Sequence, residues 1–125
     1  MVARLGAHPV EPEMALTILF RDLVLAKDDE PAVSMAVEMV DTNAVQASFS
    51  VVGAASDTQV TMSLEQGNDG ENWRPNGPST QTRGDEFAFL SRWDHVCTKF
   101  VRLRCEIAAS TGVAIITANI NTTKT

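Results

Sequence analysis

The sequence predicts an all-β fold: an antiparallel β-sandwich, jelly-roll or Greek-key like, with about seven to eight strands. Three observations predict it. Several runs alternate apolar and polar residues with period two, short segments rich in Gly, Asn, Asp and Ser separate those runs, and 44% of the 125 residues are hydrophobic. Period-two alternation indicates strands with one buried and one solvated face. Many short strands with turns between them are typical of a sandwich, and the length fits one domain with a real core.

The four clearest strands lie after residue 44. Run 99–107, KFVRLRCEI, alternates four apolar residues with two arginines and a glutamate. Runs 45–52, VQASFSVV, and 58–66, TQVTMSLEQ, show the same alternation. Run 112–120, GVAIITANI, is β-branched and apolar on both sides up to Thr117, which predicts a strand with little exposed surface.

Two loops separate these strands in pairs. GAASD at 53–57 and AASTG at 108–112 combine Gly with small polar residues, and both have the length of hairpin loops. We therefore predict two hairpins, 45–66 and 99–120.

The run ALTILFRDLVL at 15–25 predicts a strand with an irregularity. Apolar residues alternate up to Phe20, and the phase changes at Leu23. One extra residue in a strand produces such a change, so we predict a β-bulge near Arg21 and Asp22.

The segment DDEPAVSMAVEMVD at 28–41 fits two structures. As a strand it puts Val33, Met35, Val37 and Met39 on one face. As a helix it would begin with Pro31 behind an acidic cap and bury a stripe of Val and Ala. The β-rich context favours the strand. Residues 1–13, with two prolines and little pattern, predict a flexible or partner-bound N-terminal arm, and 14–125 a single β-sandwich domain.

Charge and hydropathy exclude several classes of function. The formal net charge is −6, which argues against a nucleic-acid partner, because phosphate binding needs clustered Lys and Arg. No stretch has the ~20 apolar residues of a membrane helix, so we expect no membrane insertion. No apolar region precedes Pro9, so the sequence predicts synthesis in the cytoplasm without a signal peptide.

The residue patterns predict no catalytic residue, no cofactor and no metal. CxxC, HExxH, GxSxG and Gly-rich phosphate motifs are absent from the sequence. His95 and Cys97 lie two residues apart without a visible third group to orient them. If Cys97 and Cys105 shared one strand they would be ~26 Å apart, too far for a disulfide, so we expect two buried free thiols. A structural calcium in the acidic loops is the alternative for metal.

The segment LEQGNDGENWRPNGP at 64–78 is the most distinctive loop. Asp69-Gly70 suits a tight turn, because Gly accepts a positive φ. Asn72 is expected to bond nearby backbone, and Trp73 to fold back over the end of the sandwich.

Two segments of the chain also resemble known proteins. SLEQGNDGENW at 63–73 resembles the strand-turn-Trp signature QxSNDGxNW of discoidin-like jelly-roll modules, and is similar to β-sandwich proteins of phage particles and related bacterial assemblies. KFVRLRCEIAASTG at 99–112 matches a later strand of the type YVRLxxxxxxG. The resemblance covers about 45–120 and implies a jelly-roll sandwich. The chain departs from the carbohydrate-binding members in having Gly67 where Ser is usual, and in lacking their pair of terminal cysteines.

The function we predict is that of a non-enzymatic structural protein, a repeating subunit of a phage or virus-like particle or of a bacterial filament or shell. It is expected to be a homo-oligomer located in the virion or assembled particle. Edge strands, the N-terminal arm and the tail NINTTKT would make the contacts. An apolar residue on a wet strand face suggests a subunit contact, so the interface candidates are Phe100, Arg102 and Arg104.

The alternative is a lectin-like module that binds a glycan with the 67–78 loop. Its ligand candidates are Asn68, Asp69, Asn72, Trp73 and Trp93. The aromatic residues between 73 and 93 fit sugar stacking in this reading, and core or interface packing in the first.

Overall fold

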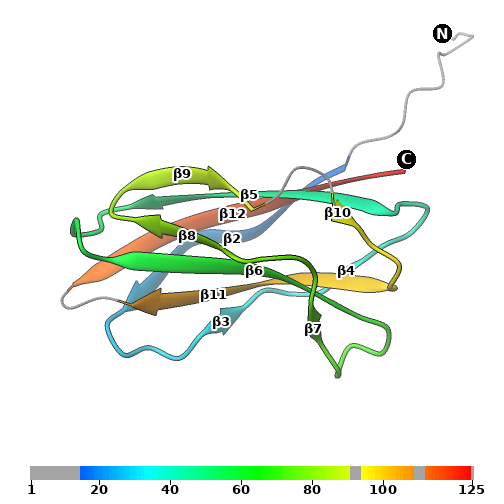
Figure 1. The fold of residues 1–125 in the computed structure, drawn as a ribbon, viewed down its shortest axis with the longest axis horizontal. Helices are drawn as coiled ribbons and strands as arrows, with labels where there is room; N and C mark the ends of the chain where they lie inside the picture. The colour runs from blue at the N-terminus through cyan, green and yellow to red at the C-terminus, as the bar shows by residue number, and fades with distance from the viewer. Residues whose placement is uncertain (1–14, 91–93, 109–111, 125) are drawn as a thin grey trace, which may run out of the picture.

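A computed structural model describes residues 15–90, 94–108, 112–124, and these form strands, turns and loops with no helix among them. The strands face each other in two layers (Figure 1). Their bounds are β2 (Ala15–Ala26), β3 (Ala32–Val33), β4 (Val37–Glu38), β5 (Ala44–Val52), β6 (Gln59–Gly67), β7 (Arg74–Pro75), β8 (Thr80–Arg83), β9 (Glu86–Phe89), β10 (Asp94–His95), β11 (Phe100–Ala108) and β12 (Val113–Thr123).

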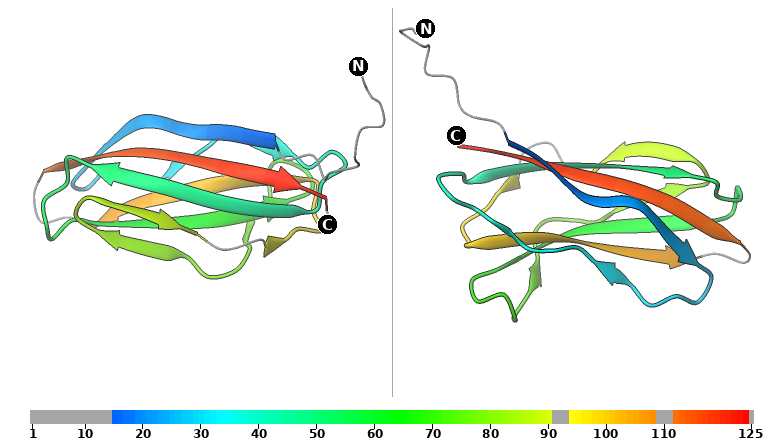
Figure 2. Two further views of the ribbon diagram at one scale, coloured as in Figure 1. Left: turned by 90° about the horizontal axis from the view of Figure 1, so that it is seen from above. Right: turned by 180° about the vertical axis from the view of Figure 1, so that it is seen from behind.

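The strand order is that of a jelly roll. Sheet I has the order β9/β10–β5–β12–β2, and sheet II has the order β3/β4–β11–β6–β7/β8, with every pair antiparallel. Two short strands written with a slash pair with the same neighbouring strand and count as one position. The described chain therefore fills eight strand positions. Successive positions alternate between the sheets except at β6 and β7/β8, which are neighbours in sheet II, and the first and last strands lie side by side (Figure 2). The predicted antiparallel β-sandwich is confirmed.

The two predicted hairpins are wrong, although their strands are right. β5 belongs to sheet I and β6 to sheet II, and β11 and β12 are divided in the same way. The 53–58 loop therefore crosses from one sheet to the other. Alternation shows that each strand buries one face, and that burial is achieved here by packing against the opposite sheet rather than by pairing with the next strand.

The core lies between the sheets and consists of the alternating residues that the sequence predicted. Sheet I contributes alternate residues of β5 and β12, and sheet II those of β6 and β11. The largest fully buried apolar side chains are Phe49, Met62, Leu64, Leu103, Ile116 and Ile120. These side chains interdigitate from both layers, so the core fixes the spacing of the two sheets.

The predicted bulge in β2 is present. Across β12, Ile116 pairs with Leu23 and Ala118 with Phe20, so two residues of β2 oppose Thr117 alone. Asp22 has φ +51°, its N–H donates to the Thr117 Oγ1 at 3.1 Å, and the Thr117 hydroxyl donates to the Asp22 Oδ1 at 3.4 Å. The side-chain bonds replace ladder bonds that the extra residue interrupts.

Segment 28–41 forms two short strands and no helix. Both β3 and β4 pair with β11. Between them Ser34 is buried: its N–H donates to the Leu103 carbonyl, and its hydroxyl accepts from the Leu103 N–H, each at 2.9 Å. The expected single apolar face is wrong, because the register with β11 shifts by one residue between β3 and β4: Ala32 and Val37 pack against the core, and Val33 and Met35 are exposed.

The predictions for the two ends of the sequence have different outcomes. The arm predicted at 1–13 lies outside the described residues. The tail was expected to lie along a neighbour, but residues up to Thr123 belong to β12, where Asn121 pairs with both Leu16 and Gln46. None of the described segments is a helix with the length and apolarity needed to cross a bilayer.

Candidate functional site

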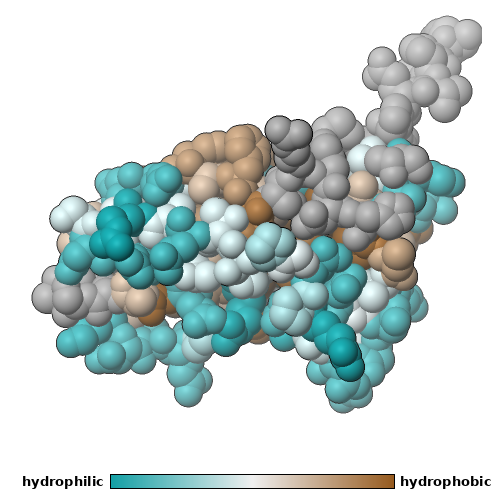
Figure 3. Space-filling model, in the orientation of Figure 1, coloured by the Kyte–Doolittle hydropathy of each residue, from teal (hydrophilic) through white to brown (hydrophobic). Residues whose placement is uncertain are grey.

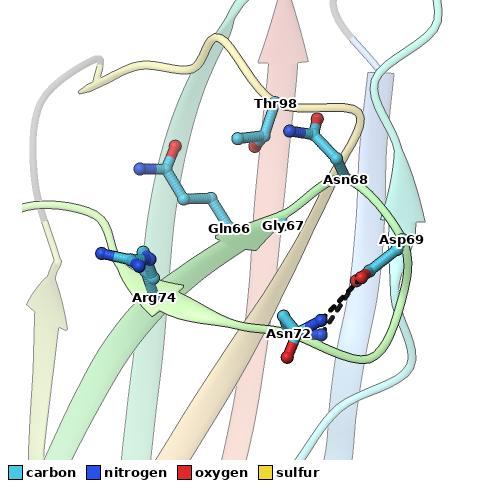
Figure 4. Close-up of a pocket in the computed structure, with 7 residues that line it drawn as sticks. All are labelled: Gln66, Gly67, Asn68, Asp69, Asn72, Arg74 and Thr98. Atoms are coloured by element: carbon cyan, nitrogen blue, oxygen red, sulfur yellow. Dashed lines mark hydrogen bonds between the residues drawn. The ribbon is translucent and has the colours of Figure 1, made fainter.

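The loop between β6 and β7 is organised around the carboxylate of Asp69. Its Oδ1 accepts the N–H groups of Glu71 and Asn72, both at 2.9 Å. Its Oδ2 accepts the Asn72 side-chain amide at 2.7 Å, and Figure 4 shows Asn72 bonded to Asp69. These bonds favour the charged form and lower the pKa of Asp69 from 3.8 to about 2, with the Asn72 backbone bond as the largest cause. Gly70 completes the turn with φ +78°.

Trp73 leaves this turn and lies over the outer face of sheet II. Its indole N–H donates to the Gly70 carbonyl at 3.3 Å. The Arg102 guanidinium carbon lies 4.2 Å from the centre of its ring. The predicted fold-back of Trp73 is present, but the ring lies on the outer face of sheet II, against the interface candidate Arg102, rather than over the end of the sandwich.

Gly67 allows this close return of the chain. A Cβ at this position would clash with the Asn72 carbonyl oxygen and would contact the Trp73 ring at 3.5 Å. A serine, usual here in the discoidin-like signature, would meet the same oxygen. The departure at Gly67 is therefore explained by the path of this loop.

The three interface candidates are half-buried on the outer face of β11. Arg102 forms an ion pair with Glu65 at 2.8 Å, with both side chains mostly covered. Arg104 pairs with Glu106 on its own strand. Lys99 lies 5.3 Å from the centre of the Phe100 ring. All three are engaged within the chain.

A shallow pocket of about 240 Å³ lies between the Asp69 turn and the segment before β11. It is lined by Gln66, Gly67, Asn68, Asp69, Asn72, Arg74 and Thr98 (Figure 4). The structure thus brings together Asn68, Asp69 and Asn72, three of the five ligand candidates. The Asn68 side-chain oxygen accepts the Lys99 N–H at 3.0 Å. Trp73 is not among the lining residues, and Trp93 lies outside the described residues.

Sequence reasoning missed a second surface, on the outer face of sheet I. Phe87 and Phe89 on β9 are 60% and 56% exposed, and their rings meet edge to face with centres 5.3 Å apart. Figure 3 shows this apolar surface at the upper edge of the molecule, over β9. The signal in the sequence was two aromatic residues two positions apart, which places both on one face of a strand. The pattern does not say whether that face is buried or exposed.

The cysteines differ in environment. Both are free, but Cys97 is exposed and Cys105 is buried. The expected burial of Cys97 is wrong because β11 begins at Phe100, so the alternation does not extend back to it. Burial, with a smaller effect of Glu106, raises the pKa of Cys105 to about 12. Within the described part of the chain, no group of three His, Cys, Asp or Glu side chains is placed to hold a metal ion.

Comparison with known proteins gives a likeness of fold. No family model matches the chain. No curated protein matches it either. Solved structures of infectious bursal disease virus are similar: the VP2 subviral particle (TM-score 0.65, 8% identity, 98% of this chain and 37% of that chain), the Gx strain (0.64, 8%, 98% and 36%) and the T13 viral particle (0.61, 8%, 98% and 35%).

At such identity the likeness concerns the fold alone. The chain spans about a third of the length of the viral proteins it matches. The described residues are thus folded as a β-sandwich of the kind found in a viral particle.

Proposed function

We propose that this chain is a non-enzymatic structural protein, a β-sandwich subunit that repeats in a larger assembly of the phage or virus-like particle type. Two kinds of observation support the proposal. The fold is similar to that of proteins of viral particles over 98% of the chain. The surface carries many large apolar side chains that a lone soluble domain would bury or replace.

The exposed apolar side chains are the observation that carries the proposal. Seven of them lie on β2, β5, β9 and β12 of sheet I, namely Leu16, Ile18, Val24, Val52, Phe87, Phe89 and Val113. Scattered apolar residues are normal on a protein surface, whereas a concentration on one face marks an interaction site. Burial of this face in an assembly removes its apolar area from water, which is the main favourable term in association.

The packed core beneath that face is suited to a repeating subunit. The buried side chains of both sheets leave little freedom for the strands to shift, since a close-packed core resists rearrangement. A rigid subunit loses little conformational entropy when it associates, which lowers the cost of assembly.

The test is the mass of the purified chain in solution, measured by light scattering across a range of protein concentrations. The expected result is a discrete assembly heavier than the 13.5 kDa chain. A mass of one chain at every concentration would overturn the proposal.

A second candidate function, glycan binding, is favoured by one observation. The pocket beside the Asp69 turn is lined mainly by amide and other polar side chains, which suit hydroxyl groups of a sugar. The test is titration with a glycan panel, followed by NMR shifts of the loop amides. Saturable shifts that are lost in Asn72→Ala, with the fold retained, would support it, and no shifts with any glycan would exclude it.

A further inference from the structure

The outer faces of the two sheets differ sharply in charge. On sheet I, the outward residues are every second residue of β5 from Gln46 to Val52, every second residue of β12 from Val113 to Asn121, and Phe87 with Phe89 of β9. None of these is Asp, Glu, Lys or Arg, and β2 adds the exposed Asp22, whose carboxylate bonds the outward Thr117 at the edge of the sheet. On sheet II, charged side chains line the corresponding face, among them Glu65, Arg102, Arg104 and Glu106. In a chain with 26 charged residues, it is a marked feature that β5, β9 and β12 carry no charge on this face, which is called the neutral face below.

The neutral face has two apolar rims and a polar centre. One rim is the Phe87–Phe89 pair on β9. The other is on β2, where Leu16, Ile18 and Val24 are 61%, 38% and 57% exposed. The rims lie at opposite edges of the sheet, with β5 and β12 between them.

The polar centre is partly satisfied within the sheet. The Ser48 hydroxyl donates to the Asn119 side-chain oxygen at 3.0 Å, and Ser48 is buried. At the bulge, Thr117 and Asp22 bond each other. Covering Ser48 and Asn119 therefore costs less than covering unpaired groups, because a neutral polar group is costly to bury mainly when it lacks a partner, whereas the Asp22 carboxylate would cost more.

We infer that the outer face of sheet I is the contact surface for a second copy of this chain, packed sheet on sheet. The inference rests on the proposed structural function. Its warrant is charge: a two-fold contact brings the same patch of both copies together, so charged side chains near the centre of the patch would meet like charges. For a chain of net charge −6, the neutral face is the one with no charge on its central strands, and Asp22 lies on the edge strand β2, away from the axis.

The geometry of the face also fits a second copy. A two-fold axis parallel to the strands sets β9 of one copy over β2 of the other, so the aromatic rim meets the aliphatic rim. Four strands ~4.8 Å apart and ~30 Å long present roughly 600 Å². A pair of copies would then cover roughly 1,200 Å² in total, which is within the range of specific interfaces.

The first experiment is sedimentation velocity on rim variants of the full chain. Phe87→Ser/Phe89→Ser removes the aromatic rim and Leu16→Ser/Ile18→Ser the aliphatic one. Val33→Ser/Met35→Ser is the matched control, since it removes exposed apolar side chains from the segment that borders sheet II. Each rim variant is expected to raise the dissociation constant of the pair at least tenfold, while the control keeps it unchanged. Circular dichroism and thermal unfolding check that each variant is folded.

The outcomes separate this inference from the proposed function. A wild-type chain that stays monomeric overturns both. If the wild-type chain assembles but the rim variants keep its mass, or the control dissociates, the outer face of sheet I is not the contact surface. The proposed structural function would then still hold.

A charge exchange provides an independent test at Ser50, which lies on the outward face of β5 opposite Thr117. Ser50→Glu alone and Ser50→Lys alone are each expected to dissociate the pair by like-charge repulsion. An equimolar mixture is expected to associate again. Failure of the mixture to associate, with both variants folded, would overturn the pairing of this face with itself.

Discussion

The Arg102 guanidinium lies over the ring of Trp73, with 4.2 Å between its central carbon and the ring centre. The same guanidinium forms an ion pair with Glu65 on the neighbouring strand at 2.8 Å. One side chain of β11 thus connects β6 to the loop that follows it, and the loop is held against the sheet by a cation–π contact with a covered charge.

A double-mutant cycle between these residues is expected to detect this contact. Trp73→Ala and Arg102→Gln should each lower the free energy of unfolding, and the coupling between them should be about 0.5–1 kcal/mol, the usual size of a partly exposed cation–π pair. Urea unfolding of the four proteins measures it. Strict additivity would show that the two side chains do not interact in solution.

Substitution of Gly67 is expected to destabilise the loop. In Gly67→Ala the new methyl group meets the Asn72 carbonyl oxygen, which must move, at a cost of roughly 1–3 kcal/mol typical of overpacking. Ser63→Ala, on the same face of the same strand, is the matched control and should change stability little. Equal midpoints of urea unfolding for the wild type and Gly67→Ala would contradict the clash.

The Asp69 carboxylate should make stability depend on pH. Its pKa is lowered from 3.8 to about 2 by the bonds from Asn72 and Glu71. The folded-state value lies below the unfolded one, so the stabilisation is complete above about pH 4 and is lost as the pH falls toward 2. NMR titration of the carboxyl group should give a midpoint near 2.

The matching variant is Asp69→Asn. Its free energy of unfolding should be lower than that of the wild type by a constant amount above pH 4. The difference should shrink below pH 4. Glu71→Gln, which removes a charge from the same turn but keeps the bonds to Asp69, should retain the wild-type dependence. A titration midpoint of the Asp69 carboxyl group close to 3.8 would show that the hydrogen bonds to this carboxylate are not formed in solution.

The two thiols should differ in reactivity. Cys97 is exposed, whereas burial keeps Cys105 protonated with a pKa of about 12, and the thiolate is the reactive form. Alkylation of the folded chain followed by mass measurement should therefore add one label, and alkylation in denaturant two. Cys97→Ser should add none when folded. Rapid double labelling of the folded wild type would show that Cys105 is accessible.

The sequence predicted those parts of the fold that depend on local pattern. Alternation gave the positions of β5, β6, β11 and β12, and the change of phase gave the bulge at Asp22. The partners of the strands were not predicted, because a period of two specifies a buried face but not the strand beside it. The predicted hairpins failed for this reason.

The candidate site shows the same limit. Trp73 and Arg102 were assigned to different surfaces, a ligand loop and a subunit interface, since 29 positions separate them. Only the register of β6 with β11, which sets Glu65 against Arg102, brings them together. The outward direction of Phe87 was equally hidden, because it follows from its pairing with Ser50.

The pairing of β2 with β12 bears on how this domain can be joined to other polypeptides. Ala15 and Thr122 are register partners, so the described chain enters and leaves the sandwich at one corner, with the backbones about 5 Å apart. A short linker across that corner would permit circular permutation, with new termini opened in the 53–58 loop. For the same reason a protein fused before β2 and one fused after β12 would protrude from the same place, and a label there would report the orientation of every copy in an assembly.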